Sequence, residues 1–272
     1  MTSPYSPHDQ PPRLSVAIMT RDEETNIARA LESVSWADEV VVLDSGSQDG
    51  TREIARRAGA LVHEEPWRGF GAQRARSLEL CSGVWVLALD ADEAVSPRLA
   101  ESIRAVVESD QVKESGFELE RHSFHLGTWF GSRGWHRDRV LRLVRRDRAV
   151  PVTKQVHERL EVLGSVGRLD GALLHWPYRD LAHHMEKMAT YSDLKAQQLH
   201  EAGMRAGPVT AVLRSTWRLL SGYLLQGGFL YGWPGLASDL IGAHGTLLAY
   251  LKLAEYEDVT ERRESSSSAA RP

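Results

Sequence analysis

Acidic side chains follow two strand-like apolar runs in the first third of the chain. Asp44 closes the run VVVLD, and Asp90, Asp92 and Glu93 close VWVLALDADE. In an open parallel sheet, ligands bind beyond the carboxyl ends of the strands, so these carboxylates are expected at one crevice. An Asp-x-Asp turn offers oxygen ligands to Mg²⁺ or Mn²⁺, which take their other ligands from water and a substrate diphosphate. A lone turn of this kind more often caps a helix, but the second acidic strand end favours a metal and diphosphate site.

Alternating strand and helix patterns predict the sheet that positions these carboxylates. The strands are expected at residues 14–19, 39–43, 60–63 and 84–89, and the helices between them at 23–35, 50–58 and 72–81. Such alternation is typical of an α/β fold with a parallel sheet.

Composition excludes one class of partner and favours one compartment. The 272 residues carry 33 Lys and Arg against 37 Asp and Glu, a net charge of −4, so we expect no nucleic-acid partner. The single cysteine, Cys81, cannot form an intramolecular disulfide, which suits the reducing cytoplasm. We expect Cys81 to be a small buried residue.

The chain is expected to comprise four parts. Residues 1–13, with four prolines, predict a disordered lead, and the serine-rich residues 260–272 predict a disordered tail. Between them we expect a catalytic domain at 14–178 and a helical region at 179–259.

Residues 219–238 form a charge-free stretch that is long enough to span a membrane. Its glycines and Pro234 argue against a spanning helix. Five aromatic residues instead suit a surface in the lipid headgroup layer, the alternative being a hairpin packed on the catalytic domain: Trp217, Tyr223, Phe229, Tyr231 and Trp233.

Glycine-rich segments give only weak nucleotide signals. Gly69, Gly71 and Arg74 form G-x-G-x-x-R, which lacks the third glycine of a dinucleotide fingerprint, and no Walker A sequence is present. Gly46 and Gly50 could let backbone N–H groups approach a ligand, or they simply form a turn.

Six segments along the chain together match a known pattern: SVAIMTRDEETNIARAL, VVLDSGSQDGT, GFGAQRARSLELCSGVWVLALDADE, KQVHERL, HWPYRDLAHHMEKMATYS and GGFLYG, in that order. They resemble the inverting family-two glycosyltransferases of the GT-A fold, most closely those that add glucose to the lipopolysaccharide core. The resemblance implies a Rossmann-like, mostly parallel sheet with flanking helices and a C-terminal helical extension. Residues 14–115 would form the nucleotide-sugar half of the catalytic domain and residues 116–178 the acceptor half.

The resemblance also implies roles at the donor site. Thr20, Arg21 and Glu23 would line the nucleoside pocket, Asp44 would bind the uracil or ribose, and Arg74 would lie near the base or diphosphate. Asp90 would contact the ribose, Asp92 would hold Mg²⁺ or Mn²⁺, and His175 would border the diphosphate or acceptor. The chain departs from the family pattern at Asp22, Ala75 and Tyr231, which leaves donor details and the last loop open.

On the acceptor side, inversion requires a base that deprotonates a sugar hydroxyl. Glu158 is the candidate base, with His157 as the other possibility, and Trp135 and Arg142 are expected to bind the acceptor. Seven arginines lie between residues 133 and 148 against two aspartates, which suits an anionic oligosaccharide, an anionic membrane or a solvated basic strand. The histidine pairs at 122/125 and 183/184 lack a full metal-ligand set and are expected to be surface or packing residues.

The function expected from these residues is transfer of a hexose, foremost glucose, from a UDP-sugar to a lipopolysaccharide-core or other lipid-linked acceptor. The enzyme would be cytoplasmic, with peripheral contact to the inner face of the inner membrane. Two alternatives stay open: another envelope polysaccharide acceptor, and a sugar-nucleotide binding protein without catalytic activity.

Overall fold

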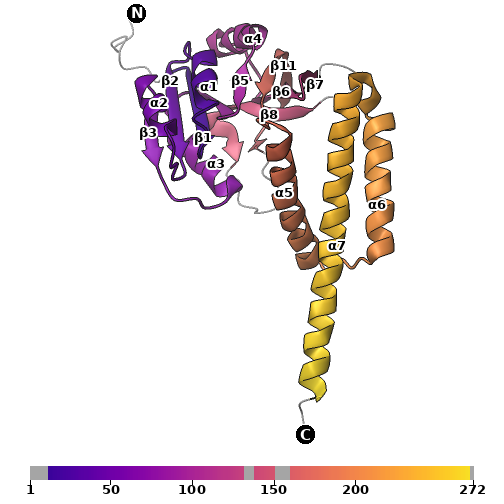
Figure 1. The fold of residues 1–272 in the computed structure, drawn as a ribbon. Coiled ribbons are helices and arrows are strands. Elements are labelled where there is room, and N and C mark those ends of the chain that lie inside the picture. The colour runs from indigo at the N-terminus through magenta and orange to yellow at the C-terminus, as the bar shows by residue number, and fades with distance from the viewer. Residues whose placement is uncertain (1–11, 132–137, 151–159, 270–272) are drawn as a thin grey trace, which may run out of the picture. The chain divides into compact units, whose positions relative to one another are not determined.

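The computed structural model describes residues 12–131, 138–150 and 160–269, with side chains described as far as Tyr256. The chain divides into two compact units (Figure 1). The first comprises Met1–Ser123 and Arg137–Trp176, and the second Phe124–His136 and Pro177–Pro272. The main boundary lies close to the predicted end of the catalytic domain at residue 178, but residues 124–136 belong to the second unit.

The main sheet of the chain, most of which lies in the first unit, is mixed and has the order β3-β2-β1-β4-β8-β6-β11-β5, with β7 paired to β6. Neighbours from β3 to β4 are parallel, whereas β8 is antiparallel to both β4 and β6. The strands are β1 Leu14–Thr20, β2 Glu39–Asp44, β3 Leu61–Glu64, β4 Trp85–Asp90, β5 Glu93–Val95, β6 Gly116–His125, β7 Thr128–Phe130, β8 Arg139–Arg145 and β11 Val166–His175. Two short strands, β9 Ala149–Val150 and β10 Glu161–Val162, pair separately after the 3₁₀ turn Arg146–Arg148.

Four helices connect these strands, and they confirm the expected α/β alternation. They are α1 Ile27–Ser33, α2 Thr51–Arg57, α3 Phe70–Glu79 and α4 Pro97–Glu108. The helix predicted at 23–35 is shorter than expected, because residues 23–26 form a turn held by hydrogen bonds to the loop after β2. Pro12 and Arg13 already pair with the start of β4, so order begins before the predicted end of the lead.

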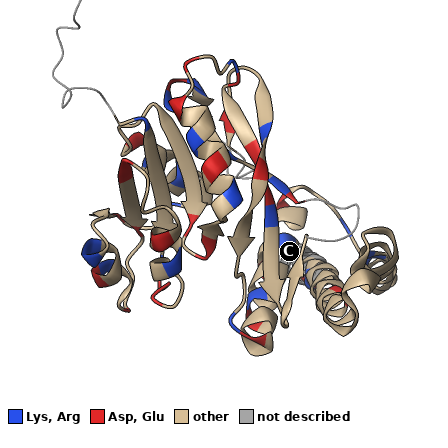
Figure 2. Cartoon of the chain, turned by 90° about the horizontal axis from the view of Figure 1, so that it is seen from above, with Lys and Arg blue, Asp and Glu red and all other residues tan. Residues whose placement is uncertain are grey.

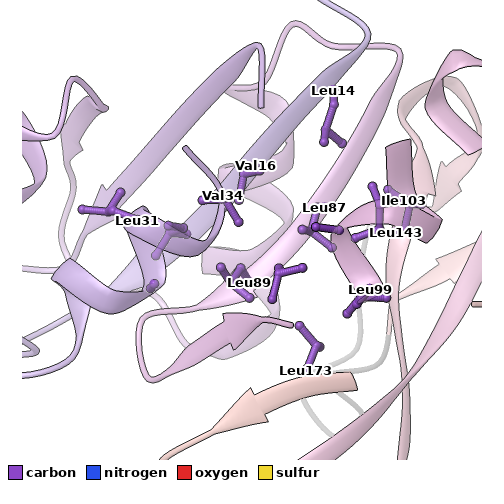
Figure 3. Packing of buried hydrophobic residues seen from close by; sticks show 14 of the residues in the cluster. Leu14, Val16, Leu31, Val34, Leu87, Leu89, Leu99, Ile103, Leu143 and Leu173 are labelled. Carbon is purple, nitrogen blue, oxygen red and sulfur yellow. The ribbon is translucent and has the colours of Figure 1, made fainter. Parts of the chain in front are cut away.

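The core of this unit lies where β1 and β4 run side by side. Val16, Leu87 and Leu89 are fully buried and pack with Leu99 and Ile103 of α4 (Figure 3). Both strands are continuous apolar runs because helices or loops cover both faces of a parallel sheet. The buried strands fix the positions of the polar residues that follow them.

The described residues of the second unit form three α-helices joined by short turns. The helices are α5 Leu181–Glu201, α6 Pro208–Leu220 and α7 Trp233–Ala269, and α7 packs against both α5 and α6 (Figure 1). The charge-free stretch 219–238 is divided among the end of α6, a π-helical turn at Ser221–Leu225, a 3₁₀ turn at Gly228–Tyr231 and the start of α7. No helix in the described part of the chain is long and apolar enough to cross a membrane.

Glycines in this stretch allow a close approach to Asp239. A Cβ atom at Gly222 would lie 2.2 Å from Asp239 Oδ1, and one at Gly228 would lie 2.1 Å from Oδ2. Asp239 accepts a hydrogen bond from Arg218 Nη1 at 3.2 Å, so the glycines make room for a partly buried ion pair between α6 and α7.

The helix α7 extends to Ala269, through most of the segment 260–272 for which the sequence predicts a disordered tail. No glycine or proline occurs between Gly245 and Pro272, so no residue type that ends a helix interrupts it.

Candidate active site

Hydrogen bonds join the loop after β1 to the loop after β2. Hydroxyl and carboxylate groups of the DSGSQDGT motif accept from backbone amides 25 to 28 residues away. The bonds are Asp22 N to Ser47 Oγ at 2.9 Å, Glu23 N to Thr51 Oγ1 at 2.8 Å and Glu24 N to Asp49 Oδ2 at 3.1 Å, with Gln48 N to Asp22 Oδ1 at 2.6 Å and Gly50 N to Glu24 Oε2 at 2.9 Å in return. We call these five bonds the loop clasp.

Asp44 lies at the base of the clasp and is completely buried. Its carboxylate accepts from the backbone N–H groups of Gly46 and Ser47, at 3.1 and 3.0 Å, and from the Ser47 hydroxyl. The amides of Gly46 and Gly50 therefore donate to carboxylates of this chain, as in the turn that the sequence left open beside ligand binding.

The other residues expected at the nucleoside pocket lie around the same strand ends. Thr20 is opposite Asp44 in the register of β1 and β2, and its Oγ1 atom is buried without a hydrogen-bond partner among the described residues. Arg21 is exposed, whereas Glu23 accepts from Asn26 Nδ2 at 2.8 Å and stabilises the turn before α1.

Asp90, at the end of β4, belongs to a buried ion network. It accepts hydrogen bonds from Arg74 of α3 and Arg142 of β8. Arg142 also donates to Glu93 at 2.9 Å, and Arg121 reaches Glu93 at 3.4 Å. Nη1 of Arg74 has no partner among the described residues, so a second buried polar atom near these strand ends is unsatisfied.

The network shifts the pKa values of Asp90 and Glu93 in opposite directions. Burial would raise the pKa of Asp90, but the charges of Arg142 and Arg74 outweigh it and hold that pKa below its usual range. Burial raises the pKa of Glu93, with Asp90 and Asp92 adding to the effect and Arg142 opposing it. Asp90 therefore remains a fixed negative charge at the site.

Asp92 lies beside His175, where β11 ends. The Asp92 Oδ2 atom is 3.5 Å from His175 Nε2, and His175 Nδ1 shares a hydrogen bond of 3.0 Å with the Ser123 hydroxyl. The backbone N–H of Trp176 donates to the Asp92 carbonyl at 2.9 Å, and the Arg29 guanidinium lies 3.5 Å from the centre of the Trp176 ring. The structure thus brings two predicted residues together from distant parts of the sequence.

A carboxylate and an imidazole in this arrangement fit a divalent cation shared with a ligand. Both side chains are only partly exposed, at 17% for Asp92 and 15% for His175. Among the described residues no group of three or more metal-binding side chains occurs. Mg²⁺ sites use one or two carboxylates and complete their coordination with water and substrate phosphates, so the Asp92 carboxylate fits such an ion, whereas imidazole is a more typical ligand of later transition metals.

Arg142, which the sequence predicts to bind the acceptor, lies in the buried ion network. It is 7% exposed and is held by Asp90 and Glu93, so it positions the carboxylates of the network. The described arginines that follow Arg142 also have partners within the chain. Arg145 and Arg148 form ion pairs with Asp147, and Arg146 donates to the Gly83 carbonyl. Three predicted acceptor-side residues lie outside the described residues: Trp135, His157 and Glu158.

Sequence reasoning assigned no role to Arg29, Arg121 or Trp176. Trp176 directly follows His175 in the motif HWPY, which is the one local signal that could have indicated it. Arg29 and Arg121 lie on α1 and β6 and are brought to the site only by packing.

Other predicted residues have packing roles. His125 and His184 are buried and share a hydrogen bond of 2.9 Å, which confirms the packing role expected for them. Cys81 is buried as predicted, and burial raises its pKa to about 12. Tyr231, where aspartate was expected, accepts from the Gly131 N–H at 3.0 Å and packs near Phe130.

Comparison with known proteins identifies the family. Residues 15–150 match the family described as glycosyl transferase family 2. The lipopolysaccharide core biosynthesis glycosyltransferase LpsC of Rhizobium meliloti is 30% identical over 88% of this chain and 91% of its own length. An uncharacterized glycosyltransferase of Rickettsia typhi is 26% identical over 89% and 87%. Among solved structures, mannosyltransferase PcManGT of Pyrobaculum calidifontis, in complex with GDP-Man and Mn²⁺, is 19% identical, with coverage of 92% and 88% and a TM-score of 0.48. From the family match and the likeness to LpsC over nearly the full length of both proteins, we conclude that this chain belongs to glycosyltransferase family 2.

Proposed function

We propose that this glycosyltransferase transfers a hexose, foremost glucose, with inversion from a UDP-sugar to the lipopolysaccharide core or another lipid-linked saccharide. The acceptor class is supported by the likeness to LpsC. The enzyme would act from the cytoplasmic side of the inner membrane, where its acceptor is anchored.

The observation that carries the proposal is a set of unsatisfied or available polar groups at neighbouring strand ends. Thr20 Oγ1 and Arg74 Nη1 are buried without partners, although buried polar atoms are normally hydrogen-bonded. A nucleoside diphosphate offers acceptors for both groups. Asp92 and His175 are then available for the metal and the phosphates.

Each donor-side residue has a task in this proposal. Arg74 would donate to the diphosphate or base, Asp90 would accept from the ribose, and Asp44, Arg21 and Glu23 would contact the nucleoside. Mg²⁺ or Mn²⁺ held by Asp92 would neutralise charge on the departing diphosphate, and His175 would border the diphosphate or the acceptor.

On the acceptor side we retain Glu158 as the base that removes the hydroxyl proton, with His157 orienting it or acting in its place. Trp135 would pack against the acceptor sugar. A carboxylate positioned in this way contributes roughly 10²–10⁴ in rate.

The test uses purified protein, UDP-glucose and lipopolysaccharide-core acceptor, with Mg²⁺ or Mn²⁺ added to protein first treated with chelator. Asp92→Ala is expected to abolish transfer and the metal-dependent part of UDP binding measured by calorimetry. Asp170→Ala is the matched control, because Asp170 is exposed and pairs with Arg98 on the surface at 2.9 Å. Near-normal, metal-independent transfer by Asp92→Ala would refute the assignment.

Calorimetry with UDP, GDP and ADP tests the base, and equal affinity for all three would exclude uridine recognition. Binding of UDP-glucose with neither transfer nor hydrolysis would favour the non-catalytic alternative. Transfer to another envelope saccharide but not to the core would correct the acceptor alone.

A further inference from the structure

The helix α6 presents its apolar side outward. The residues that face the rest of the second unit are small or polar: Ala211 is fully buried, Ser215 Oγ donates to the Ala243 carbonyl at 2.8 Å, and Arg218 pairs with Asp239. A helix on a protein surface normally has the reverse arrangement, with apolar residues inward and polar residues outward.

Five apolar side chains form the outer side of α6, and we call them the α6 face. They recur at the three- and four-residue spacing of one helix side, and their exposed fractions are high: Val209 73%, Val212 56%, Leu213 65%, Trp217 61% and Leu220 46%. The turns that follow extend this character, since Leu224, Leu225, Phe229 and Trp233 are exposed by 44% or more. Exposed apolar surface on this scale marks a site of contact with a partner or a membrane.

Charge identifies the partner that fits this surface. Between Glu201 and Asp239 the chain has Arg205, Arg214 and Arg218 and no acidic residue, and Arg205 and Arg214 are exposed (Figure 2 colours the charged residues). Two copies of the chain joined through the α6 face would bring these like charges together. A bilayer with anionic headgroups would instead attract them.

Side-chain type points to the same partner. Trp217 and Trp233 are 61% and 68% exposed, and indole rings concentrate where the headgroups of a bilayer meet its acyl chains. Since no helix in the described residues is suited to crossing a membrane, α6 would lie in the plane of the interface.

We infer that the α6 face docks on the surface of an anionic lipid bilayer, with Leu213, Trp217 and their apolar neighbours inserted below the headgroups. The docking rests on α6 alone. Its use, to bring the enzyme to an acceptor anchored in the same bilayer, rests on the proposed function.

The first experiment measures binding of the full chain to vesicles of phosphatidylglycerol and phosphatidylethanolamine by flotation. Leu213→Ser/Trp217→Ser is expected to reduce the partition coefficient at least about 10-fold, because two apolar anchors lose their lipid contact. Both residues are exposed, so the variant should keep the wild-type circular dichroism spectrum. Leu61→Ser/Trp67→Ser is the control, with the same residue types exposed by 53% and 42% in the first unit.

The second experiment locates the contact directly. Cys81 is the only cysteine in the sequence and is buried with a raised pKa, so it should resist thiol reagents. An environment-sensitive fluorophore attached at Leu213→Cys should shift to shorter wavelength when these vesicles are added, whereas the same label at Leu61→Cys should not shift.

Absence of vesicle binding by the wild-type chain, equal binding by the α6 double variant, or an unshifted label at position 213 would each overturn the inference. A lipid-free dimer that dissociates in the double variant, without vesicle binding, would instead identify a second copy as the partner. The proposed function is tested separately with detergent-dispersed acceptor, on which the α6 double variant should turn over like the wild type. Asp92→Ala should show the opposite result, with vesicle binding retained and turnover lost.

Discussion

Replacement of Arg142 by methionine tests the buried ion network. Methionine follows the unbranched stem of arginine and removes only the charged, hydrogen-bonding end. Arg142 is 7% exposed and serves both Asp90 and Glu93, so its loss leaves two carboxylates with fewer partners. Arg74 still pairs with Asp90, and Arg121 still reaches Glu93 at 3.4 Å.

The expected cost follows from these remaining contacts. Removing one partner of a buried ion pair costs about 3–5 kcal/mol, and the retained arginines favour the lower end, about 3 kcal/mol. For a domain of this size that corresponds to a melting temperature lowered by about 6–12 °C.

The difference in melting temperature from wild type should be largest at neutral pH. The pKa of Glu93 is already raised above its usual 4.5 and should rise further in the variant, so the penalty is present at neutral pH and shrinks as the pH is lowered toward 4.5.

Thermal unfolding followed by circular dichroism measures this effect. The control is Arg98→Met, because Arg98 is 73% exposed and its pair with Asp170 should contribute no more than about 1 kcal/mol. Adding Glu93→Gln to Arg142→Met should recover part of the loss, since the carboxylate left without its partner is then neutral. If Arg142→Met melts at the same temperature as Arg98→Met, the network does not stabilise the fold and the reasoning fails.

Three further predictions concern other parts of the chain. Gly171→Ala should lower the free energy of unfolding, measured by chemical denaturation, by at least about 2 kcal/mol, because φ is +99° and a Cβ atom would lie 2.4 Å from a backbone nitrogen of α4. Gly59→Ala, with φ +84° and open space around the Cβ position, should lower it by about 1 kcal/mol, and equal losses would contradict the steric argument. Burial, with His125 and His183 adding to the effect, lowers the pKa of His184 to about 4, so the protein loses at most about 3 kcal/mol of its free energy of unfolding as the pH falls from 6.5 toward 4. His184→Asn should reduce this loss, and an unchanged dependence of stability on pH would refute the reasoning. Glu158→Gln should lower kcat by roughly 10²–10⁴ with little change in donor affinity by calorimetry, and wild-type turnover would show that Glu158 is not the base.

The parts of the fold that could be predicted from sequence depend on local patterns. Continuous apolar runs and helical spacing indicated β1, β2 and β4 with the helices between them, and the acidic strand ends indicated Asp90 and Asp92. These signals lie within a few residues of the features they predict, because neighbouring side chains determine whether a strand is buried and where a turn forms.

The role of Arg142 could not be predicted in this way. Among seven arginines in sixteen residues it is indistinguishable from its neighbours, and a basic run is usually solvated. It is buried because β8 pairs antiparallel with β4 and β6, which brings Arg142 to a carboxylate 52 residues away. Such pairing depends on the whole sheet and leaves no local trace.

The DSGSQDGT motif illustrates a different limit. The sequence indicated a ligand-binding role for Asp44 of this motif but gave none to Ser47, Asp49 and Thr51, which accept backbone amides of the preceding loop. Polar side chains that complete a turn and those that hold a ligand have the same composition, so sequence alone does not separate them.

The loop clasp also has a thermodynamic consequence for donor binding. Fixing the backbone of one residue costs about 1–2 kcal/mol of conformational entropy, and residues 22–24 and 47–51 are already ordered by their mutual hydrogen bonds. A nucleotide would bind to loops that are already ordered, so the entropy of ordering them is lost during folding and does not weaken nucleotide binding. Hydrogen exchange at the amides of Asp22, Glu23 and Glu24 should therefore be slow before any ligand is added. Ser47→Ala or Thr51→Ala, each of which removes the hydroxyl of one clasp bond, should accelerate that exchange and weaken nucleotide affinity.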